Sequence, residues 1–156
     1  MEKRKQSPSS GEKRIIVIIG CGKEKRRHKT KAKFLYCGIH FKKCLCLAKQ
    51  ITDEENIFIF SAKYGLIELE KEIHPYDIKL TNLLRSEREE WVQTVNKQIK
   101  EMGLNKTQFV FICSPSYHKY FKGITLLPKL RMGLQMKWMT QKIKEQRCTL
   151  FTKELK

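Results

Sequence analysis

Residues 14–19 read RIIVII, and this run of β-branched residues decides the fold. An uninterrupted apolar run of this length is typical of a strand that is buried on both faces, as the strands of a parallel sheet are. Residues 56–60 (NIFIF) and 108–113 (QFVFIC) have the same character. The sequence therefore predicts at least three strands that lie inside the protein and run parallel to one another.

The stretches between the apolar runs have the features of helices. Apolar side chains recur at helical spacing in residues 38–50. Residues 86–89 (SERE) match a capping box and Gly103 is a typical helix stop, which predicts a helix over residues 87–102. We also expect helices at residues 114–121 and 130–146 and a strand at residues 124–127. This alternation favours right-handed βαβ units, and hence an α/β fold with a mostly parallel central sheet of about four strands.

The length of 156 residues suits one domain with a substantial core. We expect a flexible basic arm at residues 1–12, a single α/β domain at residues 13–147 and a C-terminal tail at residues 148–156. The chain contains no run of about 18 apolar residues, so we expect no membrane partner and a cytoplasmic location. In that compartment the six cysteines are expected to be free thiols.

The charge of the chain is strongly unbalanced, with 33 Lys and Arg against 16 Asp and Glu. Residues 1–33 have a net charge of +9 and residues 129–156 a net charge of +6, out of +17 for the whole chain. If the two ends meet in space, they form a basic patch that attracts phosphate groups irrespective of sequence. This charge predicts a nucleic acid or a nucleotide as partner. The alternative is a lysine-rich composition that only keeps the protein soluble.

Small, polar and aromatic residues follow each apolar run where the strand is expected to end. In an open parallel sheet, ligands bind outside the carboxyl ends of the strands. The predicted strands therefore bring their flanking residues to one edge, where we expect a binding site. The candidates at this edge are Cys21, Lys25, Ser61, Lys63, Tyr64, Gly65, Tyr76, Asp77, Ser114 and Gly133.

Three of these residues are candidates for catalysis, and each also has a simpler explanation. Cys21 is either a reactive thiol or a small buried residue. Lys63 and Lys25 could each hold a phosphate or, once desolvated, act as a nucleophile. The two lysines are equally consistent with ordinary charged side chains in solvent. Asp77 is one of only two aspartates, and it is either a rigidly held general base or the cap of the next turn.

Several common sites are absent from the sequence. Residues 20–22 (GCG) lack the spacing of a P-loop or of a dinucleotide-binding fingerprint. Cys44 and Cys46 are close to Cys37 and His40, but they form no Cys-x-x-Cys pair and point to nearly opposite faces of the predicted helix. No nucleophile elbow of a serine hydrolase is present. We therefore expect no metal site and no cofactor.

The same residues form a pattern that resembles a known family. The pattern is a strand followed by a Cys and a Lys four residues apart, an AxxLY stretch with a Phe five residues on, a strand ending in SAKYGL, a PYD and a late Gly before a Trp. In this chain the pattern is carried by residues 21–25, residues 32–36 with Phe41, residues 61–66, residues 75–77, and Gly133 with Trp138. Over about residues 14–140 the chain resembles the DUF6884 type, a family of unassigned function common in bacteria and phages.

That family is similar to the uracil-DNA-glycosylase-like core of archaeosine synthase. The resemblance implies a three-layer α/β/α fold and a pocket for a nucleobase or nucleoside, in a bacterial or phage-infected cell. Our hypothesis is an enzyme that acts on a nucleobase, at its N-glycosidic bond, in nucleic acid or nucleotide. Tyr36, Tyr64 and Tyr76 would stack on the base, and Asp77 would orient water or stabilise a cationic sugar. The alternatives are a non-catalytic basic nucleic-acid-binding protein of phage origin and a hydrolase or transferase of free nucleotides.

Overall fold

The computed structural model describes residues 13–154, with side chains as far as residue 145. Its centre is a five-stranded sheet in the order β4-β3-β1-β6-β7. The strands are β1 (Ile15–Gly20), β3 (Ile57–Ser61), β4 (Gly65–Glu68), β6 (Gln108–Ile112) and β7 (Ile124–Thr125). Neighbouring strands pair in parallel except β3 and β4, which are antiparallel. The α/β class and the mostly parallel sheet are therefore confirmed, with one strand more than expected.

The first apolar run forms the middle of the sheet. β1 pairs with β3 on one side and with β6 on the other. Its side chains alternate between two buried clusters, with Val17 and Ile19 in one and Ile16 and Ile18 in the other. Both faces of this strand lie in the core, and this is why its sequence is apolar without alternation.

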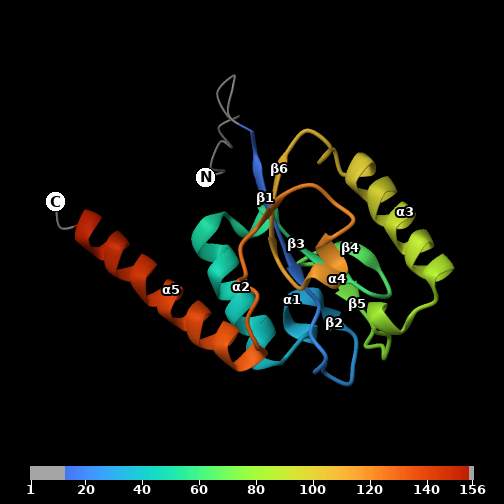
Figure 1. Ribbon diagram of the computed structural model, residues 1–156, viewed down its shortest axis with the longest axis horizontal. Helices are drawn as coiled ribbons and strands as arrows, with labels where there is room; N and C mark the ends of the chain where they lie inside the picture. Colours follow the sequence, from blue (N-terminus) through green and yellow to red (C-terminus); the bar gives the residue numbers. More distant parts are fainter. Residues whose placement is uncertain (1–12, 155–156) are drawn as a thin grey trace.

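Helices pack against both faces of the sheet. The cluster with Val17 and Ile19 is completed by side chains of α2 (Ile39–Ile51) and α5 (Met132–Glu154). The opposite cluster is completed by α3 (Arg85–Glu101), through Trp91, Val95 and Ile99. Figure 1 shows α2 and α5 on one side of the strands and α3 on the other. No helix in the described part of the chain combines the length and the apolar character needed to cross a membrane.

The shorter elements lie between these main ones. They are β2 (Thr30–Lys31), α1 (Ala32–Leu35), β5 (Glu72–Ile73), α4 (Pro115–His118) and two 3-10 helices at Glu54–Asn56 and Leu80–Asn82. β2 and β5 pair with each other in an antiparallel ribbon. Of these elements only α4 was predicted, and it ends at His118 rather than near residue 121.

The start of α3 differs from the prediction. The helix begins at Arg85, because the carboxylate of Glu87 accepts a hydrogen bond from the backbone N–H of Leu84 at 2.7 Å. Ser86 lies inside the first turn, so it does not cap the helix as the SERE pattern suggested. Only the Glu half of the expected capping box is present.

The end of α3 is as predicted. Gly103 has a φ of 70°, and its N–H donates to the carbonyl of Lys100 at 3.1 Å. The N–H of Leu104 reaches back to the carbonyl of Ile99 at 2.9 Å. These two bonds form the Schellman arrangement, whose left-handed residue is usually glycine.

The C-terminal helix is longer than predicted. We expected it to end near residue 146, whereas α5 continues to Glu154. No glycine or proline follows Gly133, so the sequence contains no residue that would stop the helix earlier. The flexible arm expected at residues 1–12 lies outside the described residues.

Candidate functional site

A hollow with a volume of about 220 Å³ lies just beyond the carboxyl end of β1. We call it the basic hollow, because its lining includes Cys21, Lys23, Lys25, Asp77, Lys79 and Tyr117. The side chains of Lys23, Asp77 and Lys79 are exposed, whereas Cys21 and Lys25 are half-buried. The structure therefore brings together three of the candidates, Cys21, Lys25 and Asp77, at the edge where the parallel topology predicted a site.

A backbone hydrogen bond to β3 and a side-chain contact with α4 hold Cys21 in place. Its backbone N–H donates to the carbonyl of Phe60 at 3.0 Å, which continues the β1–β3 ladder by one residue. Its thiol lies 3.1 Å from the hydroxyl of Tyr117, on α4. The ring of Tyr117 stacks on Phe60, with the ring centroids 6.2 Å apart and the planes 11° apart. Cys21 is thus a positioned thiol at the rim of the hollow.

A second hollow, of about 470 Å³, lies on the other side of Cys21 and Tyr117. We call it the sulfur-lined hollow, because Cys21, Cys44, Cys113, Met132 and Met136 contribute to its lining. Ser114, a predicted binding residue, also lines this space, and its hydroxyl lies 2.5 Å from that of Ser116. Ser114 therefore shares a hollow with Cys21, but not with Asp77.

Three of the predicted binding residues form a hydrogen-bonded cluster beneath the site. The hydroxyl of Ser61 donates to that of Tyr76 at 2.7 Å, and the hydroxyls of Tyr76 and Tyr36 lie 2.6 Å apart. Ser61 is fully buried and Tyr36 is 1 % exposed. The ammonium of Lys25 lies 4.6 Å from the centre of the Tyr76 ring, over its face. Because their hydroxyls and faces are occupied, Tyr36 and Tyr76 are not placed to stack on a base.

Burial controls the protonation of these phenols. It raises the pKa of Tyr36, Tyr76 and Tyr117 well above the usual range, and the negative charge that a Cys21 thiolate would carry raises all three further. Burial also raises the pKa of the neighbouring Cys113 thiol. The phenols are therefore neutral at ordinary pH, and they can donate or accept hydrogen bonds but cannot act as bases.

The SAKYGL motif builds a tight hairpin. Residues 62–64 form the turn between β3 and β4, and the hydroxyl of Ser61 accepts the backbone N–H groups of Lys63 at 3.3 Å and Tyr64 at 3.0 Å. Gly65 has a φ of 76°, and a Cβ at this position would collide with the carboxamide of Gln98. Ser61 and Gly65 are thus required by the turn itself.

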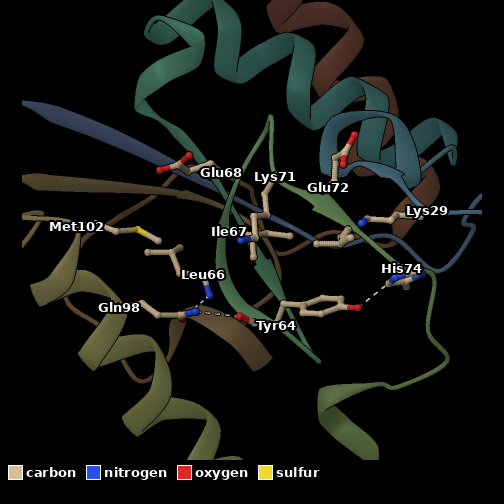
Figure 2. A pocket seen from close by; sticks show the side chains of 11 residues that line it. Lys29, Tyr64, Leu66, Ile67, Glu68, Lys71, Glu72, His74, Gln98 and Met102 are labelled. Carbon is tan, nitrogen blue, oxygen red and sulfur yellow. Dashed lines mark hydrogen bonds between the residues drawn. The ribbon is translucent and has the colours of Figure 1, made fainter.

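Lys63 and Tyr64 do not line the basic hollow. Tyr64 lines a separate pocket of about 480 Å³ along the outer edge of β4 (Figure 2). Its hydroxyl donates to the carbonyl of His74 at 3.4 Å, and Gln98 bonds to the carbonyl of Tyr64 at 3.0 Å. The ammonium of exposed Lys63 lies 5.2 Å from the centre of the Tyr64 ring. The expectation that Cys21, Lys25, Ser61, Lys63, Tyr64 and Asp77 line one concavity is therefore met only in part. Cys21, Lys25 and Asp77 line the basic hollow, whereas Ser61, Lys63 and Tyr64 do not.

Gly133 lies in the first turn of α5, beside Ile39, Lys43 and Met136 in a shallow depression. Nothing lies within 4 Å of the place that a Cβ on this residue would occupy. The position therefore does not require glycine, and Gly133 is not among the residues that line the basic hollow.

Sequence reasoning did not select Tyr117, Lys23 and Lys79, which all line the basic hollow. Tyr117 follows Ser114 and Pro115, the start of α4, so its position one turn beyond a strand end was a usable signal. Lys23 and Lys79 could not be told from other surface lysines. Among the described residues, no group of three or more His, Cys, Asp or Glu side chains is placed to hold a metal ion.

The fold and the site define an α/β protein with a small basic hollow at the carboxyl edge of a mostly parallel sheet. The chain belongs to a family of unknown function (DUF6884), whose model matches residues 16–141. This match confirms the family that the sequence pattern suggested. No curated protein and no solved structure matches the chain.

Proposed function

We propose that the protein is an enzyme that acts on a nucleobase at its N-glycosidic bond, with the reaction at the basic hollow. One observation carries the proposal: the carboxylate of Asp77 lies in a small hollow together with three lysines and the Cys21 thiol. A carboxylate suits the activation of water or the stabilisation of a cationic sugar, and lysines suit the binding of phosphate.

The size of the hollow supports a small reacting group. Sites for drug-sized ligands usually measure about 300–1,000 Å³, whereas the basic hollow measures about 220 Å³. A single base fits such a space better than a whole nucleotide does. The sugar and phosphates would then remain outside, where the exposed ammonium groups of Lys23 and Lys79 lie. Extrusion of a base into a pocket is how enzymes reach a base within nucleic acid.

The roles assigned to individual residues follow from this geometry. Asp77 would orient the attacking water, and Lys25 would face the departing base from its position over the Tyr76 ring. Tyr117 lines both hollows, and it replaces Tyr36, Tyr64 and Tyr76 as the proposed aromatic contact by lining the space rather than by stacking, because its ring already stacks on Phe60. The proposal keeps the three-layer α/β/α framework and the likeness to a uracil-DNA-glycosylase core that the sequence pattern implied, and a bacterial or phage-infected cell as the setting.

The test is release of free base from DNA, RNA and nucleotides, including modified bases, by the full chain. Replacing Asp77 with Asn keeps size and removes the charge. Removing a general base or acid costs typically about 10²–10⁴-fold in rate, so Asp77→Asn is expected to lose base release to that extent while retaining its melting temperature within a few degrees.

The matched control is Asp53→Asn. Asp53 and Asp77 are the two aspartates of the chain, and Asp53 is likewise exposed but stands before the short helix Glu54–Asn56. Asp53→Asn makes the same chemical change at a position away from the hollow, so the rate of base release by this variant should equal that of the parent. Equal rates for Asp77→Asn and Asp53→Asn, or no base release by the parent protein on any substrate, would reject the proposal.

Binding of nucleic acid without catalysis is the second candidate, and the charge of the folded part favours it. Residues 13–145 contain 27 Lys and Arg against 13 Asp and Glu, a net charge of +14. The basic character therefore belongs to the domain rather than to residues 1–12, whose net charge is +1. A protein of this class would bind nucleic acid in a salt-dependent way and release no base.

A further inference from the structure

Two helices that cover the same face of the sheet bring together three side-chain atoms that can bind a metal ion: an imidazole nitrogen, a thiol sulfur and a thioether sulfur. His40 and Cys44 lie one turn apart on α2, and Met139 projects from α5. The Cys44 sulfur lies 3.7 Å from Nδ1 of His40 and 3.7 Å from the sulfur of Met139. Cys44 is 2 % exposed and Met139 is fully buried. The cluster is independent of Asp77 and the basic hollow, since neither His40, Cys44 nor Met139 lines that space.

The hydrogen bonds around His40 fix which ring nitrogen has its lone pair free. The amide nitrogen of Gln135 donates to the carbonyl of Pro128 at 3.0 Å, so its oxygen is the atom that faces Nε2 of His40, at 3.4 Å. Nε2 must therefore be the N–H donor in the neutral ring. A histidine that binds a metal usually donates its other ring N–H to an acceptor in this way. Nδ1 is left with its lone pair directed toward the thiol of Cys44.

The thiol of Cys44 consequently has two possible acceptors for its single proton, Nδ1 of His40 and the sulfur of Met139, and it can donate to only one of them. An imidazole nitrogen and a thioether sulfur thus each lie 3.7 Å from the Cys44 sulfur. We propose that His40, Cys44 and Met139 form a binding site for a soft univalent cation, Cu(I), which replaces that proton.

The distances suit such an ion. Metal–sulfur bonds of about 2.3 Å and metal–nitrogen bonds of about 2.0 Å, as in zinc sites, place the donors of a three-coordinate ion about 3.7 to 4.0 Å apart. Both distances from the Cys44 sulfur fall at the lower end of this range. Thiolate and thioether ligands select Cu(I) over harder ions. Zn²⁺ is not expected here, because only two of the three donors are of the type that it prefers.

An ion can reach the cluster from the sulfur-lined hollow, because His40 and Cys44 both contribute to its wall. Met132 and Met136 line the same space and supply further thioethers along the approach. Once bound, the ion would join α2 to α5 through bonds at both helices. We therefore expect it to stabilise the packing of α5 on the domain.

Binding exchanges one proton for one metal ion: the S–H bond of Cys44 breaks, a copper–sulfur bond forms and H⁺ leaves to solvent. No oxidation or reduction takes place.

The experiment is anaerobic competition for Cu(I) between the reduced full chain and the chromophoric chelator bicinchoninate. Met139→Leu keeps volume and apolar character, so it should fold, and it is expected to weaken Cu(I) binding by about tenfold or more. Cys44→Ala should weaken it further. The matched controls are Cys46→Ala, two residues along the same helix, and Met102→Leu, a methionine that packs against the opposite face of the sheet.

The proposal is supported if both controls bind Cu(I) like the parent and if Cu(I) raises the melting temperature of the parent by more than that of Met139→Leu. It is overturned if Met139→Leu binds as tightly as Met102→Leu, or if Cys46→Ala loses as much affinity as Cys44→Ala. Equal affinity for Zn²⁺ and Cu(I) would also overturn it, because the thioether would then have no selective role.

Discussion

The thiol of Cys21 and the hydroxyl of Tyr117 lie 3.1 Å apart, although 96 positions separate the two residues in the chain. The contact ties the segment after β1 to the helix after β6. It also forms the wall between the basic hollow and the sulfur-lined hollow, since both residues line both spaces.

Tyr117→Phe isolates this contact. The variant keeps the stacking on Phe60 and loses the hydrogen bond to Cys21. We expect a loss of about 0.5–1.5 kcal/mol in the free energy of unfolding, the usual net worth of one such bond. Urea denaturation measures it. A loss above about 3 kcal/mol would show that the ring has also moved.

Ser61→Ala should cost more. The hydroxyl of Ser61 accepts two backbone N–H groups and donates to Tyr76, and the residue is fully buried. Leaving such groups without partners costs about 1–3 kcal/mol, which denaturation of the variant would reveal. Ser86→Ala is the control: Ser86 is exposed and caps no helix end, so the change should stay within about 0.5 kcal/mol.

Two glycine substitutions should have different effects. Gly65→Ala forces a side chain into a left-handed conformation and against Gln98, so we expect a loss of more than about 1 kcal/mol in stability. Gly133→Ala has open space and a helical backbone, and it should be neutral or stabilising by up to about 1 kcal/mol. Equal melting temperatures for the two variants would contradict this assignment. Base release by Gly133→Ala should match that of the parent.

Alkaline pH should destabilise the fold. Burial raises the pKa of Tyr36, Tyr76 and Tyr117 in the folded state, whereas in the unfolded chain these phenols ionise near pH 10. Above that pH the unfolded state binds fewer protons than the folded state, so stability falls as pH rises. The phenolate absorbance of these three tyrosines should appear only together with unfolding. Reversible ionisation of all five tyrosines in the folded protein would contradict the prediction.

Salt should weaken any binding of nucleic acid. The logarithm of the binding constant is expected to fall linearly with the logarithm of salt concentration, with a slope that counts phosphate contacts. If Lys79 binds a phosphate at the basic hollow, Lys79→Gln should reduce that slope by about 1. Lys106→Gln, an exposed lysine after α3, should leave it unchanged. Binding that does not depend on ionic strength would contradict the nucleic-acid hypothesis.

The three central strands could be predicted because each is an apolar run, and sheet topology then placed Cys21, Lys25 and Asp77 at one edge. The sequence could not show which side chains turn inward. Tyr36 was expected to stack on a base and Ser61 to bind a substrate, but the hydroxyls of both are hydrogen-bonded to that of Tyr76 in the core. Short antiparallel pairs such as β2 and β5 also gave no signal, because two residues cannot establish a period.

The short hairpin at residues 61–65 limits what its motif can reveal about other proteins. Ser61 bonds to the turn and Gly65 adopts a conformation that favours glycine, so both are needed for the chain to reverse direction. A descendant that had lost all activity would still need them in order to fold. SAKYGL therefore identifies the architecture of a sequence that contains it, and the proposed activity should instead be sought in sequences that have equivalents of Cys21 and Asp77.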